Sequence, residues 1–110
     1  MSIAANDRDD DAIISISHVT PKPGMKDQFV DMQTQFQTRV APEIEGLLGG
    51  RFYAAEDGKS FVIMSRFRSR KDLESWARSD RFGEHMARIR PLIETASPSR
   101  FSILYQSGTV

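Results

Sequence analysis

The sequence predicts an α+β domain in which a four-stranded antiparallel sheet carries two helices on one face. Two observations support this prediction. Segments with the patterns of strands and helices follow one another in the order β-α-β-β-α-β, the split βαβ arrangement, and right-handed crossovers place both helices on the same side of the sheet. In addition, 110 residues suffice for one domain and leave no room for a separate catalytic or regulatory one.

The first strand and the first helix are predicted between residues 12 and 41. Residues 12–20 are rich in β-branched side chains and stop at the proline- and glycine-containing residues 21–24, as a strand does before a turn. A helix follows from about residue 25 to residue 41, where Pro42 breaks it. Its apolar residues recur every three or four positions, as on one buried stripe: Met25, Phe29, Met32, Phe36 and Val40.

The two central strands are predicted over residues 50–55 and 60–68, with residues 56–59 as the turn of an antiparallel hairpin. Ser69 and Asp72 have the spacing of a capping box, so the second helix begins at about residue 70. Ser79 is a second plausible cap, which predicts that this helix is bent or doubled.

The last strand is predicted over residues 100–106, where apolar and polar residues alternate. Pro91 and Pro98 come before it and interrupt a helix or a central strand.

Apolar side chains are expected on both faces of the sheet. On the third strand, alternation places Phe61, Ile63 and Phe67 on one side and Val62 and Met64 on the other. Because two helices cover only one face, the other would be an exposed apolar patch. The sequence therefore predicts a homodimer joined through the sheet faces.

Composition narrows the classes of function. The chain has no cysteine, which excludes disulfides, thiol nucleophiles and zinc sites that need sulfur. Its 15 basic and 15 acidic residues cancel, so no net field attracts nucleic acid or an anionic membrane. No apolar run approaches the ~20 residues that cross a bilayer. We expect a cytoplasmic protein without a nucleic-acid or membrane partner.

Charge is nevertheless unevenly distributed. Residues 1–11 hold four acids and one base, which predicts a flexible acidic N-terminal tail and leaves residues 12–110 as the single domain. Residues 66–90 hold eight bases and four acids, which predicts a basic surface around the second helix.

Motifs for metals, nucleotides and acyl transfer are missing. His18 and His85 lie far apart without metal-binding spacing, and the chain has no G-x-G-x-x-G, P-loop or G-x-S-x-G sequence. RNA-recognition domains share the predicted strand order, but Lys59 stands where their first base-stacking aromatic belongs. The expectation is no metal and no RNA.

A pocket between the sheet and the helices is the remaining place for function. Trp76 and His85 are nine residues apart, about half a turn on a straight helix, so they share a pocket only if the helix bends near residues 79–83. The apolar candidates also suit ordinary core packing, and both Trp76 and His85 also admit purely structural roles. The candidate lining residues are Phe29, Met32, Phe36, Trp76, Phe82 and His85.

Several short motifs, in this order and spacing, resemble the antibiotic biosynthesis monooxygenase (ABM) domain over residues 12–106. They are the first strand, turn and helix, then residues 45–51, residues 57–62, and residues 73–76 with Ser79. The resemblance implies a ferredoxin-like fold that pairs into a dimeric α/β barrel, with one pocket in each subunit.

Some ABM-domain proteins oxidise polycyclic aromatic phenols with O₂ and without metal or flavin. The resemblance implies a monooxygenase for an aromatic or otherwise apolar small molecule that needs no cofactor, with the protein supplying desolvation and proton transfer. The catalytic candidates are His85 as the base, Trp76 and Ser17. Arg90 or Arg88 would stabilise the anion, and the candidate substrate contacts are Phe29, Met32, Phe36, Phe82 and Arg90.

A sister branch of the family binds and degrades haem with an asparagine, a tryptophan and a histidine. Trp76 and His85 match the last two in type, and Ser17 stands closest to the place of the asparagine. Haem binding or haem degradation is therefore the alternative function, with haem as the alternative cofactor. A non-catalytic module that binds a small ligand is the third possibility.

Overall fold

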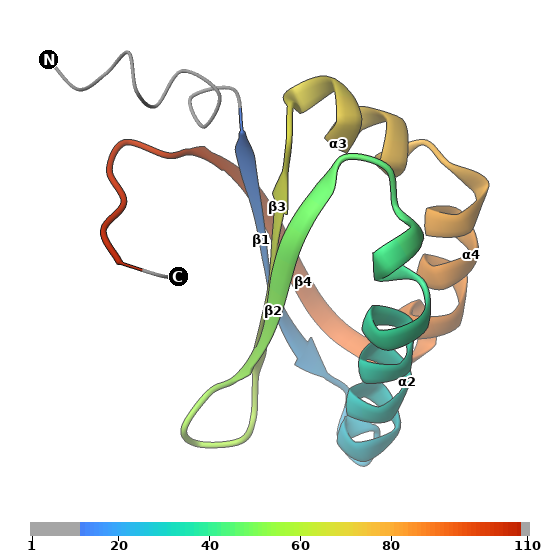
Figure 1. Ribbon diagram of the computed structural model, residues 1–110. Helices are drawn as coiled ribbons and strands as arrows, with labels where there is room; N and C mark the ends of the chain where they lie inside the picture. Colours follow the sequence, from blue (N-terminus) through green and yellow to red (C-terminus); the bar gives the residue numbers. More distant parts are fainter. Residues whose placement is uncertain (1–11, 109–110) are drawn as a thin grey trace, which may run out of the picture.

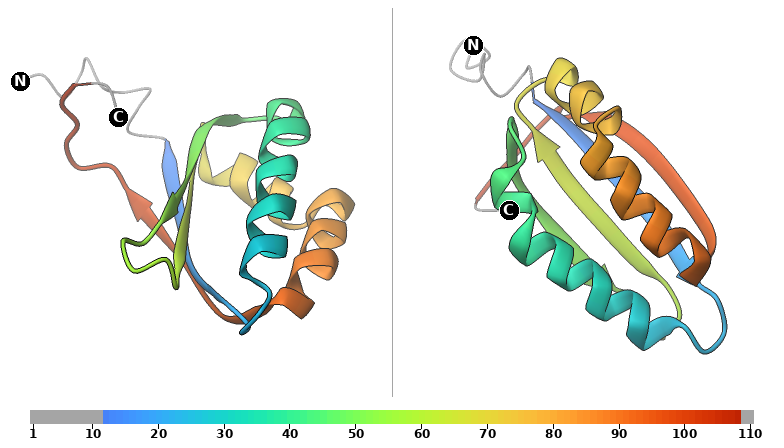
Figure 2. Two further views of the ribbon diagram at one scale, coloured as in Figure 1. Left: turned by 90° about the horizontal axis from the view of Figure 1, so that it is seen from below. Right: turned by 90° about the vertical axis from the view of Figure 1, so that its right-hand side faces the viewer.

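One antiparallel sheet with α-helices on a single face makes up the fold (Figures 1 and 2). The strand order β2-β3-β1-β4 and the alternation of elements confirm the expected α+β, ferredoxin-like fold. This computed structural model describes residues 12–108, so the tail predicted over residues 1–11 lies outside the described residues. The elements are β1 (Ile13–Pro21), α2 (Lys26–Arg39), the 3₁₀ turn η2 (Ala41–Glu43), β2 (Leu47–Ala54), β3 (Phe61–Phe67), α3 (Arg70–Ala77), α4 (Asp80–Ile89), the 3₁₀ turn η3 (Arg90–Leu92) and β4 (Ile93–Ser102).

The last strand corrects the sequence prediction. Residues 100–106 were expected to form it, whereas β4 ends at Ser102 and begins at Ile93. Pro98 lies within β4, opposite Ser17, because β4 is an edge strand and its outer side needs no N–H for a neighbour. Beyond Ser102 the chain turns away from the helices (Figure 1), and the side chain of Leu104 is 98% exposed.

The other elements lie within three residues of their predicted bounds. β2 begins earlier than predicted because the chain turns at Gly46 and the strand starts directly after it. Gly46 has a φ of +82°, a conformation that glycine adopts without steric strain. The carbonyl of Gly46 accepts a hydrogen bond from the Arg68 N–H at 2.7 Å, which joins this turn to the end of β3. A Cβ at residue 46 would lie 2.5 Å from the side chain of Asp72.

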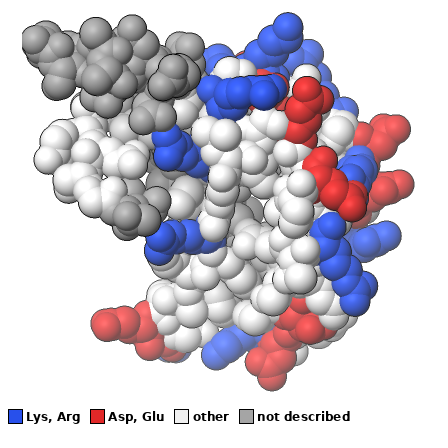
Figure 3. All heavy atoms as spheres, viewed as in Figure 1, with Lys and Arg blue, Asp and Glu red and all other residues white. Residues whose placement is uncertain are grey.

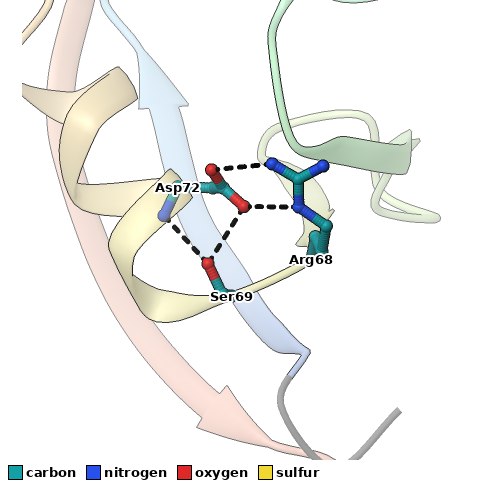
Figure 4. Close-up of polar contacts among 3 residues, drawn as sticks. All are labelled: Arg68, Ser69 and Asp72. Carbon is teal, nitrogen blue, oxygen red and sulfur yellow. Dashed lines mark hydrogen bonds and ion pairs between the residues drawn. The ribbon is translucent and has the colours of Figure 1, made fainter. Parts of the chain in front are cut away.

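The cap of α3 has the predicted residues (Figure 4). The Asp72 N–H donates to Ser69 Oγ at 3.1 Å, and the Ser69 hydroxyl donates to the Asp72 carboxylate at 2.9 Å. The same carboxylate accepts two hydrogen bonds from the Arg68 guanidinium, at 2.8 and 3.1 Å. The hydrogen bonds from Arg68, and secondarily the one from Ser69, hold the pKa of Asp72 below its usual value.

The second helical region is doubled, as predicted, and Ser79 stands at the break. Its Oγ accepts from the Phe82 N–H at 3.2 Å and so caps α4. Its hydroxyl donates to the Trp76 carbonyl at 2.7 Å, at the end of α3. One side chain therefore satisfies backbone groups of both helices.

Two clusters of buried side chains form the core between sheet and helices. One is built from Val19, Phe29, Phe61 and Leu92, and the rings of Phe29 and Phe61 lie 5.6 Å apart. The other is built from Ile13, Phe67 and Leu73. Val19 and Ile13 lie near opposite ends of β1, so the middle of this sheet face belongs to neither cluster.

The opposite face of the sheet carries apolar side chains, as predicted. The register places Val62 beside His18, and Met64 beside Ile16, on this face. Tyr53 and Phe101, which alternation puts on the same side, are 45% and 46% exposed. In the part of the chain that the structure describes, no helix covers this surface.

Charged side chains gather over the helical side of the molecule and leave a broad uncharged area beside it (Figure 3). Several of the bases predicted to form a basic surface are paired with acids, as Arg81 is with Glu43 at 3.0 Å and Arg78 with Glu74 at 3.7 Å. Such exposed pairs contribute little stability, but they reduce the local positive charge. Within residues 12–108, no helix combines the length and the apolar character needed to span a membrane.

Candidate functional site

Small and polar residues occupy the middle of the helix-covered sheet face, between the two core clusters. The register places Gly50, Ser65, Ser15 and Arg100 side by side across all four strands. Ser17 lies two residues further along β1 and so on the same face. Because the serines and the glycine fill little space, they leave a cavity of about 680 Å³ beneath the helices.

Aromatic side chains form the helical wall of this cavity. The ring of Phe36, on α2, lies 6.0 Å from that of Trp76 and 3.7 Å from that of His85, measured between centroids. Trp76 meets Phe82 edge-on at 5.6 Å. The break at Ser79 turns α4 relative to α3, and both Trp76 and His85 line the cavity, as the sequence required of a bent helix.

His85 is buried, at 7% exposure, and has one hydrogen bond to the described part of the chain. Its Nε2 lies 3.0 Å from Oε1 of Gln33, a side chain of α2 that is 2% exposed. Burial, and secondarily the positive charge of Arg88, lower the pKa of His85 to about 4. The imidazole is therefore neutral at pH 7.

Arg100 is the charged residue among the described side chains that line the cavity. It comes from β4 and pairs loosely with Glu74 of α3, with 3.6 Å between Arg100 Nη1 and Glu74 Oε2. Both side chains are 40% exposed, so the pair is weak and holds the guanidinium only loosely. The cavity thus combines an apolar aromatic wall with one cation at its floor.

The sequence model of the antibiotic biosynthesis monooxygenase family matches residues 12–88. This match covers the first three strands and the helices that build the cavity. The chain belongs to the ABM family. A search of curated proteins found no match.

Solved structures of ABM-like fold are similar to this chain over most of its length. Rv0793 from Mycobacterium tuberculosis is 18% identical, with a TM-score of 0.78 over 88% of this chain and 99% of its own. SnoaB from Streptomyces nogalater, described as a cofactor-independent oxygenase and solved as a mutant, is 14% identical, with a TM-score of 0.78 over 87% and 96%. PA3566 from Pseudomonas aeruginosa is 18% identical, with a TM-score of 0.72 over 86% and 95%. At these identities the likeness concerns the fold.

The structure brings together five of the eight site residues suggested by the ABM resemblance. They line one cavity and come from β1, α2, α3 and α4: Ser17, Phe36, Trp76, Phe82 and His85. Their assigned roles stay predictions.

The other three predicted site residues lie outside the cavity. Phe29 is fully buried in the core cluster with Val19 and Phe61, and Met32 packs against that cluster. They share a helical stripe with Phe36, but the sheet beneath them carries large residues and leaves no space. Arg90 is exposed in η3, and neither it nor Arg88 lines the cavity.

Sequence reasoning missed Gln33, Arg100 and, on the floor beside Ser17, the serines Ser15 and Ser65. Gln33 follows Met32 in the helix, and a lone glutamine gives no signal of burial. Arg100 was missed because the last strand was predicted to begin at residue 100, whereas the part of β4 that lines the cavity begins at Ile93. The alternation of Ser15 and Ser17 with isoleucines on β1 was a readable signal, since a small polar residue at every second position marks a face that is not filled by its own side chains.

Proposed function

We propose that this ABM-family chain is a monooxygenase that oxidises an aromatic, weakly acidic small molecule with O₂ and needs no cofactor. One observation carries the proposal: a neutral, buried imidazole lines the same aromatic-walled cavity as Arg100, the one cation among the described lining residues. An acidic phenol or its keto tautomer suits this cavity. Its flat apolar body fits the aromatic wall, it can give a proton to His85, and its anion can pair with Arg100.

In the proposed reaction, His85 accepts a proton from the substrate, and the resulting anion is electron-rich enough to reduce O₂ directly. For a ring CH₂ beside a carbonyl, the carbanion and O₂ join to a peroxide anion, which takes the proton back from His85 to become a hydroperoxide. The hydroperoxide then loses water and leaves a new carbonyl group. One oxygen atom enters the product, the other leaves as water, and the substrate supplies all four electrons. The protein's part is desolvation and proton transfer.

The low pKa of His85 decides how this proton transfer works. An imidazole of pKa about 4 is always ready to accept a proton at pH 7, but it is a weak base in the empty cavity. Transfer becomes favourable when the product is an ion pair, because the new anion offsets the charge on the imidazolium and Arg100 lowers the pKa of the bound substrate. Substrate binding and base strength are therefore coupled.

We also propose that two copies pair through the uncovered sheet face in the cytoplasm. The support is the row of apolar side chains there, with Tyr53 and Phe101 nearly half exposed, and the exposed Leu104 and Tyr105 next to β4. This pairing would leave the helix-covered cavity of each subunit open to its substrate.

Oxygen uptake with a panel of polycyclic phenols of the anthrone class tests the proposal. We expect uptake by the wild-type chain and a fall in kcat of about 10²-fold or more in His85→Gln. Arg100→Met should lower kcat/KM about tenfold to a hundredfold. Arg78→Met is the matched control, because Arg78 pairs with the same Glu74 but lies away from the cavity.

No uptake by the wild type above buffer, across the panel, contradicts the oxygenase proposal, and binding without uptake favours a ligand-binding module. Haem ligation through His85 Nε2 would require that its bond to Gln33 be broken, so only Nδ1 is open to iron in this cavity. A hemin titration checks this: a Soret shift that His85→Gln abolishes would favour the haem alternative.

A further inference from the structure

Gln33 and His85 are the two polar side chains that are buried in the described part of the chain, and they bond to each other. They are 2% and 7% exposed, lie on α2 and α4, and join through Gln33 Oε1 and His85 Nε2 at 3.0 Å. Burial of a polar group lowers stability unless the group is hydrogen-bonded, so this bond is an integral part of the cavity wall. The proposed function so far gives Gln33 no role.

The amide restricts the protonation state of the imidazole. An amide oxygen only accepts hydrogen bonds, and a neutral imidazole carries a single N–H. Because the oxygen of Gln33 faces Nε2, the hydrogen of His85 lies on Nε2 and the lone pair on Nδ1. Among the described residues no hydrogen bond reaches Nδ1, so this nitrogen is left to a ligand.

The stack on Phe36 does not by itself determine which edge of the imidazole faces Gln33. The two rings are nearly parallel, at 19°, which fixes the plane of the imidazole. A half-turn of the imidazole about its Cβ–Cγ bond keeps the same plane but exchanges the positions of nitrogen and carbon. Only the bond to Gln33 distinguishes these two orientations.

We infer that Gln33 is a positioning residue, which holds His85 in the Nε2–H tautomer and leaves Nδ1 as the atom that accepts the substrate proton. The inference rests on the proposed function for the source of that proton, but the tautomer is a property of the free protein.

The charges around His85 explain why a neutral amide suits this place. Arg88 of α4 acts on His85 electrostatically, and Arg100 of β4 lines the same cavity. The residues that α2 and α3 contribute to the cavity carry no charge, and no carboxylate is found among its described lining residues. A glutamate at residue 33 would introduce one, pair with the imidazolium and so raise the pKa of His85.

Nitrogen-15 NMR of the full chain, labelled at histidine, tests this at pH 7. For the wild type we expect a protonated Nε2 and an unprotonated Nδ1 at His85. Gln33→Leu should give a mixture of tautomers. Gln37→Leu, the same substitution one turn further along α2, also lies on the cavity wall and should leave the tautomer unchanged. A hydrogen on Nδ1 in the wild type, or an unchanged spectrum in Gln33→Leu, would overturn the inference.

Gln33→Glu supplies a second readout that needs no loss of packing. The carboxylate should raise the NMR titration midpoint of His85 by at least about one pH unit from its wild-type value, and move the pH profile of kcat/KM in the same direction. An unmoved midpoint means that residue 33 does not act on His85. If the wild type consumes no oxygen, the proposed function fails, while the tautomer measured by NMR still decides the role of Gln33.

Discussion

The imidazole of His85 lies parallel to the ring of Phe36, with 3.7 Å between their centroids and 19° between their planes. This contact joins α2 to α4 at the point where both helices pass over the small residues of the sheet. It also removes one face of the imidazole from water, which contributes to the burial that lowers its pKa. The aromatic wall therefore sets both the shape of the cavity and the protonation of its histidine.

Acid should destabilise the protein through His85. Its pKa is about 4 in the folded state and near 6.5 in the unfolded chain, so the unfolded state binds the proton first as the pH falls. The stabilisation present above pH 6.5 is lost between about pH 6.5 and 4, by up to about 3 kcal/mol of unfolding free energy. Urea titrations across this range should show the fall, and His85→Gln should remove most of it. Equal slopes in both proteins would contradict the assignment.

Gly50→Ala should destabilise the sheet, whereas Gly49→Ala should not. A Cβ at residue 50 would lie 2.7 Å from the carbonyl oxygen of Met64, a backbone atom that cannot move freely. At residue 49 no atom lies within 4 Å of such a Cβ. We expect Gly50→Ala to lower the unfolding free energy by about 1–3 kcal/mol relative to Gly49→Ala, measured by urea denaturation. Two variants of equal stability would show that the strand shifts to admit the methyl group.

Ser79→Ala should loosen the junction of α3 and α4. The variant loses the bonds to the Phe82 N–H and the Trp76 carbonyl, and the loss of such a cap costs about 1 kcal/mol. Because Trp76 is the chain's one tryptophan, its fluorescence should shift in the folded variant as well. Ser75→Ala, on the exposed side of α3, is the control and should change neither quantity. An unaltered Tm in Ser79→Ala would contradict the role of this cap.

Ser65→Leu should close the cavity without unfolding the protein. Ser65 lies on the cavity floor between Gly50 and Ser15, and a leucine side chain would extend into the empty space above it. Binding of an aromatic ligand, followed by calorimetry, should weaken at least about tenfold, which corresponds to about 1.4 kcal/mol. Ser75→Leu carries the same exchange on the exposed side of α3 and should bind normally. If both variants bind equally, the ligand occupies another place.

Met64→Asp should separate the proposed dimer. The charge would stand in the middle of the uncovered sheet face, beside Ile16, where pairing would have to bury it. Sedimentation velocity should give twice the 12.4 kDa chain mass for the wild type and a single chain for the variant. Gln28→Asp, on the exposed side of α2, should stay dimeric. A wild type that sediments as one chain at high concentration would remove the proposal of pairing.

Periodicity predicted the fold well because local residues determine it. The stripe from Met25 to Val40 specified a helix. Ser69, with Asp72 three residues later, and Ser79 specified two caps, each of which depends on neighbours within four residues. The end of β4 was not predictable in this way. Residues 100–106 alternate like a strand, but pairing with β1 ends at Ser102.

The site was predictable in part, for a related physical reason. Aromatic residues on the helices could be placed on a face, and the break at Ser79 gave the one condition under which Trp76 and His85 meet. Whether an aromatic residue faces a cavity or a filled core depends on the size of the residues on the sheet beneath it. Phe29 lies over Phe61 and is buried, whereas Phe36 lines the open cavity above the serines.

Pro98 has a consequence for how this molecule meets others. It stands in β4, one of the two edge strands, where the strand of another chain could otherwise pair through backbone hydrogen bonds. A ring nitrogen without hydrogen leaves a gap in that row of donors, so lateral growth of the sheet is interrupted midway along β4. Of the two edges of the sheet, the one formed by β4 is thereby closed to a strand that would pair along its whole length.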